Sequence, residues 1–499
     1  MASARDRLRA LPNELYNQVL SHLDLVSMKR LRLTSQPHAR KCLSPAFLEF
    51  YKYQETDLTA TSLQRLREIT IHPALGPAVK RLTVVAVFYN PSSLLLAIRR
   101  LRDPLRGTWT ETIPVDPNAR NKELLDKIGQ LYKIMSIRHE QQGQFSDEIV
   151  DALSHILGNL GSLDVLKLTA RVIRPDLDKA DQSVNARGVN WNCLWADCNR
   201  VFKLATCAMT MSQVHVKTFS VFTDCFGKIQ SRVLNSLNTD LSNVDSISHT
   251  GASIKSLNLG LSTATVVPVT SDIIFHKDGS MKHLAPVRIA TTETRGRTED
   301  NFPGVAAFLQ QTPNLEALDL YMYNTMDGAP WAYSGIFSHI SKTVHLPKLR
   351  RLALRGIWTK QSDLLLFLHN HPHLTHIDLR ELHVNGGPWE PILKHLQSMP
   401  DLASMHLENL WGGSEHLINL QPVNPLYGRE ERIPGQFYPT RNGTMIHTRD
   451  IGVEEIKNGL EFVKSRGSSR GKGSRALFKW IQQRKIDYGP PEEPYTNPR

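Results

Sequence analysis

The sequence contains little cysteine and no long apolar segment. Its 499 residues include five cysteines, and so small and odd a number does not build a disulfide scaffold, which favours a reducing compartment. No window approaches the roughly 18 apolar residues that a membrane-spanning helix needs. The first residues, MASARDRLRALP, carry no apolar stretch of a secretory signal. These absences predict a protein of the cytoplasm, the nucleus or both, with no membrane partner.

The sequence also lacks the short motifs that mark common catalytic sites. It has no glycine-rich phosphate loop, no G-x-S-x-G nucleophile turn and no H-E-x-x-H zinc helix. Gly467, Gly471 and Gly473 lie in a basic run that does not follow a strand pattern. We therefore predict no catalytic residue, no cofactor and no enzymatic activity.

Two groups of potential metal ligands each have a second interpretation. Cys193, Cys198 and Cys207, with His215 beyond them, lack the C-x2-C spacing of structural zinc and lie among apolar residues, which favours buried thiols. The histidine-rich segment 369–376 spans a predicted helix end, a turn and a strand, so its side chains should diverge as solvated turn histidines. We therefore predict no metal site.

The overall composition is that of a globular protein. The chain is 40% hydrophobic and 22% charged, values typical of folded domains. A formal net charge of +12 allows an acidic partner without defining one. The basic run 465–475 could bind nucleic acid, but it has no interleaved aromatic residues, so a solvated linker is the preferred interpretation.

A helical pattern begins at Leu11-Pro12. Proline suits the first turn of a helix, because its missing N–H is not needed there. Apolar residues then recur at helical spacing. A short pair of helices cannot bury this much apolar surface alone, so the rest of the chain or a partner must cover it. The apolar positions are Leu15, Val19 and Leu23, followed by Met28, Leu31 and Leu33.

The stretch 11–35, LPNELYNQVLSHLDLVSMKRLRLTS, resembles an F-box, the short helical module that docks on an SKP-type adaptor. Thr34 stands where a hydrophobic residue is usual, and Pro37 lies where the third helix should start, so we expect that helix to begin late or to be irregular. The alternative is a helical hairpin packed on its own domain. The resemblance implies these adaptor-binding residues: Leu11, Pro12, Leu15, Val19, Leu23, Met28 and Leu31.

The spacing apolar-x-x-apolar-x-apolar recurs eight times. The last four occurrences, PNLEALDL, PKLRRLAL, PHLTHIDL and PDLASMHL, have their first leucines at 315, 349, 374 and 402, which are 34, 25 and 28 residues apart. Helix-spaced apolar residues precede most of them. The pattern resembles leucine-rich repeats, whose units stack to bury their apolar faces; an ordinary α/β protein is the alternative. The middle residues of the eight sites are Leu82, Leu166, Phe219, Leu257, Leu318, Leu352, Ile377 and Met405.

We therefore expect an α/β protein in which a short helical F-box precedes an irregular leucine-rich-repeat-like solenoid of alternating helices and short parallel strands. Segments 102–123 and 263–301 break the repeat and should be a loop and an insertion. The segment after the F-box resembles that of filamentous-fungal F-box proteins. The expected regions are an F-box-like module at 1–50, linker helices with the first strand at 51–110, a repeat-like substrate domain at 111–420, and a Pro-rich, basic tail with one or two helices at 421–499.

Side chains alternate along a strand, so the leucines of each unit should face the core and the residues between them the concave surface. Trp358 and Trp411 each follow the last leucine of a unit by four residues. They either contribute to a binding surface or cap the core. The residues expected to bind a protein substrate are Tyr321, Arg351, Arg355, Trp358, His376, Asp378, Arg380, His406, Glu408 and Trp411.

The two resemblances together imply a substrate-recognition subunit of an SCF-type cullin-RING ubiquitin ligase. It would bind an SKP-type adaptor, and through it a cullin, with its F-box, and a protein target with its repeat face. The alternative is a non-ligase repeat scaffold for protein or nucleic acid. That alternative predicts Leu15, Val19 and Leu23 buried against the first predicted strand, near Leu82.

Overall fold

The computed structural model describes residues 8, 10–89, 147–173, 191–225, 227–240, 248–262, 302–322, 334–412, 418, 420 and 448–460. It is a mixed α/β structure whose main sheet is mostly parallel. The expected loop at 102–123, the expected insertion at 263–301 and the basic run 465–475 lie outside the described residues.

Four short helices open the described chain: α1 (Asn13–Ser21), α2 (Leu25–Thr34), α3 (Gln36–Lys41) and α4 (Pro45–Glu49). Asp24 caps α2 by accepting a hydrogen bond of 2.7 Å from the Ser27 N–H. The expectation that the third helix begins late is wrong. It begins at Gln36, and Pro37 lies in its first turn, where a missing N–H costs no helical hydrogen bond.

The buried side chains of these helices belong to the same hydrophobic cluster as those of the main sheet. Tyr16, Met28 and Phe47 are each at most 1% exposed. The Tyr16 hydroxyl lies 2.9 Å from His38 Nδ1, and the Arg32 guanidinium lies 4.6 Å from the centroid of the Phe47 ring. Tyr16 and His38 therefore satisfy each other's polar groups inside the helices, as burial of such groups requires.

In the main sheet, the spatial order of the strands follows their order in the sequence. All of its strands run parallel from the first to β12, and only the last is antiparallel. The strands, in spatial order, are β1 (Tyr53–Thr56), β2 (Arg81–Tyr89), β3 (Ser162–Ile173), β4 (His215–Val221), β6 (Ser256–Ser262), β7 (Ala317–Met322), β8 (Arg351–Arg355), β10 (His376–Arg380), β12 (Ser404–Glu408) and β13 (Thr448–Gly452). The two-residue β5 (Ile229–Gln230) pairs with β6 beside this path.

All eight sites of the repeated apolar spacing are strands, as predicted. The middle apolar residues also stand opposite one another in the register, from Leu82 on β2 through Leu318 on β7 to Met405 on β12. Each is at most 2% exposed. One buried row of apolar side chains therefore runs across eight strands.

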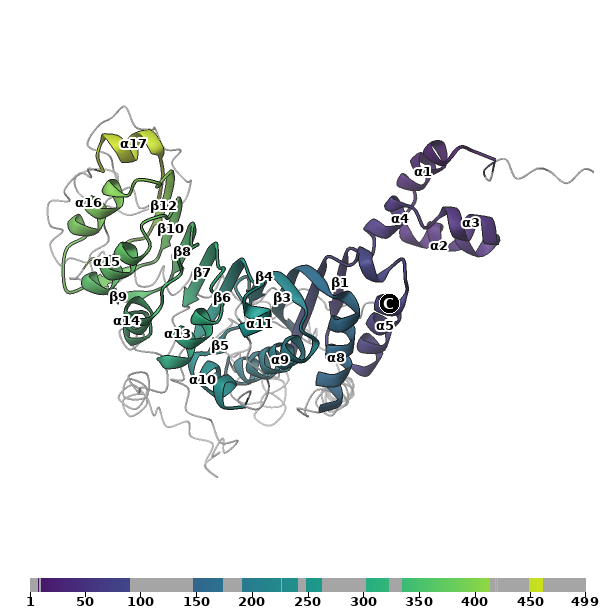
Figure 1. The fold of residues 1–499 in the computed structure, drawn as a ribbon, viewed down its shortest axis with the longest axis horizontal. Coiled ribbons are helices and arrows are strands. Elements are labelled where there is room, and N and C mark those ends of the chain that lie inside the picture. The colour runs from purple at the N-terminus through teal and green to yellow at the C-terminus, as the bar shows by residue number, and fades with distance from the viewer. Residues whose placement is uncertain are drawn as a thin grey trace, which may run out of the picture.

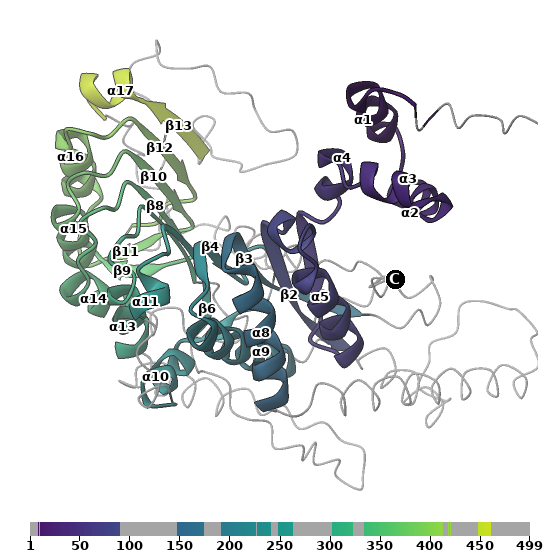
Figure 2. The same cartoon turned by 45° about the vertical axis from the view of Figure 1, so that its right-hand side comes forward.

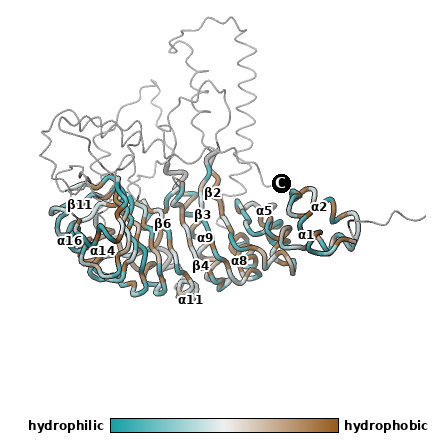
Figure 3. Tube along the Cα trace, turned by 90° about the horizontal axis from the view of Figure 1, so that it is seen from above, coloured by the Kyte–Doolittle hydropathy of each residue, from teal (hydrophilic) through white to brown (hydrophobic). Residues whose placement is uncertain are grey.

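Helices cover one face of this sheet. Figure 1 shows the strands on the inner side of an arc and the helices on the outer side. Figure 3, coloured by hydropathy, shows hydrophobic stretches in strands and helices along the whole arc. The core lies between the two layers. The helices are α5 (Ala60–Ile71), α8 (Asp147–Leu160), α9 (Trp191–Ser212), α10 (Ser231–Asp240), α11 (Ser248–Gly251), α13 (Pro303–Gln310), α14 (Ser334–Thr343), α15 (Gln361–Asn370) and α16 (Glu390–Ser398), with a 3-10 turn at Gly76–Ala78.

The chain leaves three successive strands in the same way. The residues directly after β8, β10 and β12 are Gly356, Glu381 and Asn409, with φ of 66°, 52° and 50°. A side chain at Gly356 would also meet the Met322 carbonyl oxygen at 2.4 Å, so only glycine fits there. This left-handed turn leads into two short paired strands, β9 (Trp358–Lys360) and β11 (His383–Asn385).

The sheet extends beyond the predicted end of the repeat at 420. β13 joins β12 antiparallel and is followed by α17 (Val453–Asn458). Ile451 is 1% exposed, and the Arg449 guanidinium donates to the Leu420 carbonyl at 2.9 Å. The expectation of only a tail with one or two helices after 421 was therefore wrong in part, because a single antiparallel strand does not need the apolar spacing of the repeat.

Candidate functional site

The first candidate surface consists of exposed apolar side chains on α1 and on α2. Leu15 and Val19 on α1 are 49% and 37% exposed, and Val26 and Leu33 on α2 are 55% and 87% exposed. Figures 1 and 2 place these helices at one end of the arc, beyond β1 and away from the strands at the other end. Leu15 and Val19 are four residues apart and so lie on one side of α1, and large exposed apolar side chains that adjoin one another mark interaction sites more often than single ones do.

The residues predicted to contact an adaptor divide into three groups. Pro12, Leu15 and Val19 are exposed. Met28 is 1% exposed and belongs to the core of the helices, so its inclusion in an adaptor surface is wrong for this conformation. Leu11, Leu23 and Leu31 are partly buried against the core.

The predicted adaptor-binding set lacks Val26 and Leu33, although Leu33 belongs to the helical apolar pattern. They are seven residues apart, which returns to the same helix face after about two turns. The sequence shows this spacing, but it shows an equally apolar side of the same helix that carries Met28. Only the packed structure shows which face turns inward.

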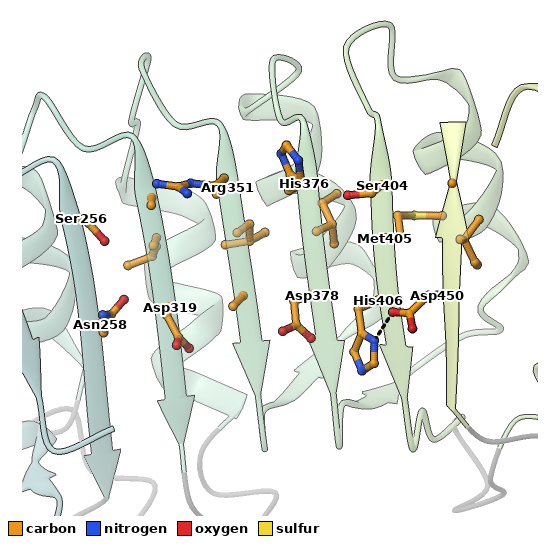
Figure 4. Close-up of a pocket in the computed structure, with 17 residues that line it drawn as sticks. Ser256, Asn258, Asp319, Arg351, His376, Asp378, Ser404, Met405, His406 and Asp450 are labelled. Carbon is orange, nitrogen blue, oxygen red and sulfur yellow. Dashed lines mark hydrogen bonds and ion pairs between the residues drawn. The ribbon is translucent and has the colours of Figure 1, made fainter. Parts of the chain in front are cut away.

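The second candidate surface is a groove of about 600 Å³ on the inner face of the sheet. Figure 4 shows the side chains that line it, carried by neighbouring strands. The register arranges them in two rows. The upper row is Ser256, Ala317, Arg351, His376, Ser404 and Gly452, and the lower row is Asn258, Asp319, Ala353, Asp378, His406 and Asp450. Small residues in both rows leave room between the longer ones.

Most carboxylates of the lower row are already bound within the protein. The Arg355 guanidinium donates to both oxygens of Asp319, with Nε 3.0 Å from Oδ1. The Arg380 guanidinium donates to both oxygens of Asp378, each at 2.8 Å. The bond to Asp378 raises the pKa of Arg380. Such two-pronged pairs have a fixed geometry, so the groove has a preorganised polar floor.

His406 lies between two carboxylates at one end of the groove. Its Nδ1 is 2.6 Å from Asp450 Oδ1, and its Nε2 is 3.8 Å from Glu408 Oε2, which is an ion-pair distance rather than a hydrogen bond. Glu408 and Asp450 raise the pKa of His406 by favouring the imidazolium. This contact ties β13 to β12.

Tyr321 and Arg355 form part of a third row next to the groove, and Tyr321 covers a buried lysine. Lys228 is 2% exposed; its Nζ donates to the carbonyls of Phe222 and Cys225 at 2.7 and 2.9 Å. The same atom lies 4.1 Å from the centroid of the Tyr321 ring. Burial lowers the pKa of Lys228 to about 8. No sequence pattern indicated this lysine, because its partners are backbone oxygens.

Trp358 and Trp411 do not lie on the groove. They are 8% and 6% exposed, and His383 stacks between them, with ring centroids 3.9 and 5.1 Å apart. The expectation that they bind substrate is wrong for this structure, which agrees with the core-capping alternative. They follow the left-handed turn after each strand, and that turn carries them off the inner face.

The cysteines and histidines that resembled metal ligands do not converge. Within the described part of the chain, no group of three or more potential ligands lies together. Cys198 and Cys225 are buried, and burial raises the pKa of both thiols; the side chain of Cys193 lies outside the described residues. The positions of Cys198 and Cys225 agree with the interpretation as buried thiols, whereas Cys207 is only partly buried.

The histidine-rich segment 369–376 diverges as predicted, but not all of it is solvated. His371 is 2% exposed; its Nδ1 lies 2.7 Å from the Phe367 carbonyl, and its Nε2 accepts from the Leu346 N–H at 3.1 Å. Burial lowers its pKa. His369 instead stacks on His395, with ring centroids 3.9 Å apart.

No family model matches the chain, and no curated protein matches it either. Among the helices in the described ranges, none is long and apolar enough to cross a membrane. The fold and the two surfaces therefore supply the basis for a functional assignment.

Proposed function

We propose that this protein is an F-box substrate receptor of an SCF-type cullin-RING ubiquitin ligase. In this proposal α1, α2 and α3 bind an SKP-type adaptor, which connects the protein to a cullin, and the groove binds a protein target. The observation that carries the proposal is the exposure of four large apolar side chains on α1 and α2, namely Leu15, Val19, Val26 and Leu33. The same helices bury Tyr16 and Met28, so they are already packed within the chain while their exposed apolar side chains are available to a partner.

The helix–strand order supports the second half of the proposal. Parallel strands lie side by side in chain order, with helices on the opposite layer, which is the arrangement expected of a leucine-rich-repeat-like solenoid. Such a solenoid offers its inner face to partners. The proposed role is not catalytic, because the receptor acts by raising the effective concentration of a target lysine near a recruited conjugating enzyme.

The scaffold alternative makes a prediction that the structure contradicts in part. It requires Leu15, Val19 and Leu23 to be buried against the first long strand. Leu15 and Val19 are exposed, whereas Leu23 is partly buried against the core. The balance of these positions favours a partner that covers α1.

A capture experiment with recombinant SKP-type adaptor tests the proposal. The full chain should retain the adaptor, and the double variant Leu15→Glu, Val19→Glu should retain at least about tenfold less, because two charges would enter an apolar interface. Leu366→Glu is the matched control. Leu366 is a 39% exposed leucine on α15, on the outer layer, and its replacement should leave capture unchanged.

Circular dichroism should show that both variants keep the wild-type spectrum. Failure of the folded wild-type chain to retain the adaptor contradicts the proposal, as does equal capture by the double variant and the control.

A further inference from the structure

The groove has hydrogen-bond donors that the protein itself does not use. Arg351 on β8 is exposed, and no described residue makes a hydrogen bond or ion pair with its guanidinium. Lys255 has the largest effect in lowering the pKa of Glu316, and Arg351 contributes a smaller one. Glu316 already accepts a hydrogen bond of 2.8 Å from Lys255. The Arg351 charge is therefore available to a ligand.

The carboxylate acceptors of the groove, unlike Arg351, already have partners within the protein. Asp319 and Asp378 have both oxygens engaged by Arg355 and Arg380, and Asp450 accepts from His406. A basic ligand would have to compete with these internal pairs. An acidic ligand would instead meet an unused guanidinium.

The neighbours of Arg351 form a suitable setting for an acidic group. Figure 4 shows its side chain extending toward β7, on the side of Ser256, with His376 on the next strand in the other direction. Its register partner on β7 is Ala317, whose small side chain leaves space beneath the guanidinium. His376 Nδ1 lies 2.8 Å from the Thr375 hydroxyl, so its Nε2 remains free to face a ligand.

Charge balance distinguishes between acidic ligands. Arg351 supplies one unpaired positive charge, and the carboxylates of Asp319, Asp378 and Asp450 line the same groove. A carboxylate monoanion matches one guanidinium, which can bind it through two parallel hydrogen bonds. A phosphate dianion would carry a second negative charge toward the lower row.

We infer that the groove binds an acidic, unphosphorylated peptide segment of the target, with one Asp or Glu carboxylate anchored by Arg351. Ser256 and His376 flank that carboxylate. This inference rests on the proposed function, since it names the class of target that the receptor takes.

The test uses the full chain and fluorescein-labelled glycine–serine peptides that each contain a single glutamate, glutamine or phosphoserine. Fluorescence anisotropy is measured near physiological ionic strength, where distant surface charges are screened beyond about 8 Å. The glutamate peptide should bind best. Arg351→Gln should weaken its binding about tenfold, the size of one charge-assisted hydrogen-bond contribution.

Lys342→Gln is the matched control. It removes the same charge from an exposed position on α14, in the outer layer, and should leave binding unchanged. Equal weakening by both variants would show general attraction to a basic protein and would overturn the inference. So would tighter, Arg351-dependent binding of the phosphoserine peptide.

The adaptor capture separates the two proposals. If the chain captures the adaptor but binds no glutamate peptide, the target class is wrong and the proposed receptor role stands. If it binds the glutamate peptide through Arg351 but captures no adaptor, the groove inference stands and the ligase role fails.

Discussion

The two ends of the molecule bury apolar surface to different degrees. In the sheet, Leu354, Leu379 and Leu407 are fully buried, whereas on the N-terminal helices Leu15 and Leu33 are 49% and 87% exposed. A helix–strand unit covers its apolar face with the next unit of the same chain. Four short helices have too few neighbours to do so. The strands therefore bury their apolar residues within the chain, whereas the N-terminal helices leave part of theirs exposed, as the proposed adaptor role requires.

The largest expected difference between the two ends is the loss of stability when one leucine at each end is replaced by alanine. Leu354→Ala should lower the free energy of unfolding by about 3 kcal/mol, because it leaves a cavity in a fully packed core. Leu15→Ala should change it by less than about 0.5 kcal/mol. Urea unfolding followed by circular dichroism measures both. A large loss from Leu15→Ala would mean that α1 is packed by its own chain.

A smaller effect should appear where β13 closes the sheet. The pKa of His406 is raised in the folded state, so its ion pairs stabilise the protein below the unfolded pKa, near 6.5, and this contribution is lost as pH rises through the folded pKa. His406→Gln should cost less than about 1 kcal/mol, because Asp450 is largely exposed.

The measurement is urea unfolding of wild type and variant at pH values below and above this range. The difference between them should shrink as the pH rises. An increase of the His406→Gln effect toward alkaline pH would contradict the assignment.

The smallest effect concerns the N-terminal helices. Pro37 lies in the first turn of α3, where it removes no helical hydrogen bond and restricts the unfolded chain. Pro37→Ala should therefore destabilise the protein by less than about 1 kcal/mol and leave adaptor capture unchanged. A clear gain in stability would show that proline strains this helix.

Much of the sheet was predictable because its signal is local and repeated. Each apolar-x-x-apolar-x-apolar site is one strand, and equal units stack in register, from Leu82 on β2 to Met405 on β12. The start of α5 was less certain. The structure caps it at Thr59, whose hydroxyl accepts from the Ser62 N–H at 3.4 Å, and the exact ends of helices are weakly specified by local sequence.

The candidate sites were predictable only in part. Alternation along the strands correctly placed Arg351, His376 and Asp378 on one face. It failed for Trp358 and Trp411, which lie past the left-handed turn that ends each strand, where strand alternation no longer applies. Alternation also could not show that Arg355 pairs with Asp319 and Arg380 with Asp378. Nor could it show that the Arg351 guanidinium has no ion-pair partner among the described residues.

The sequence by itself determined which segments become strands, which of their side chains point inward, and that the N-terminal helices carry surplus apolar surface. These properties follow from periodicity along one segment. Only the tertiary structure decided that Met28 is buried while Val26 and Leu33 are exposed, that β13 closes the sheet, and which charges of the groove remain unpaired. Those outcomes depend on contacts between residues far apart in the chain, and no local pattern encodes them.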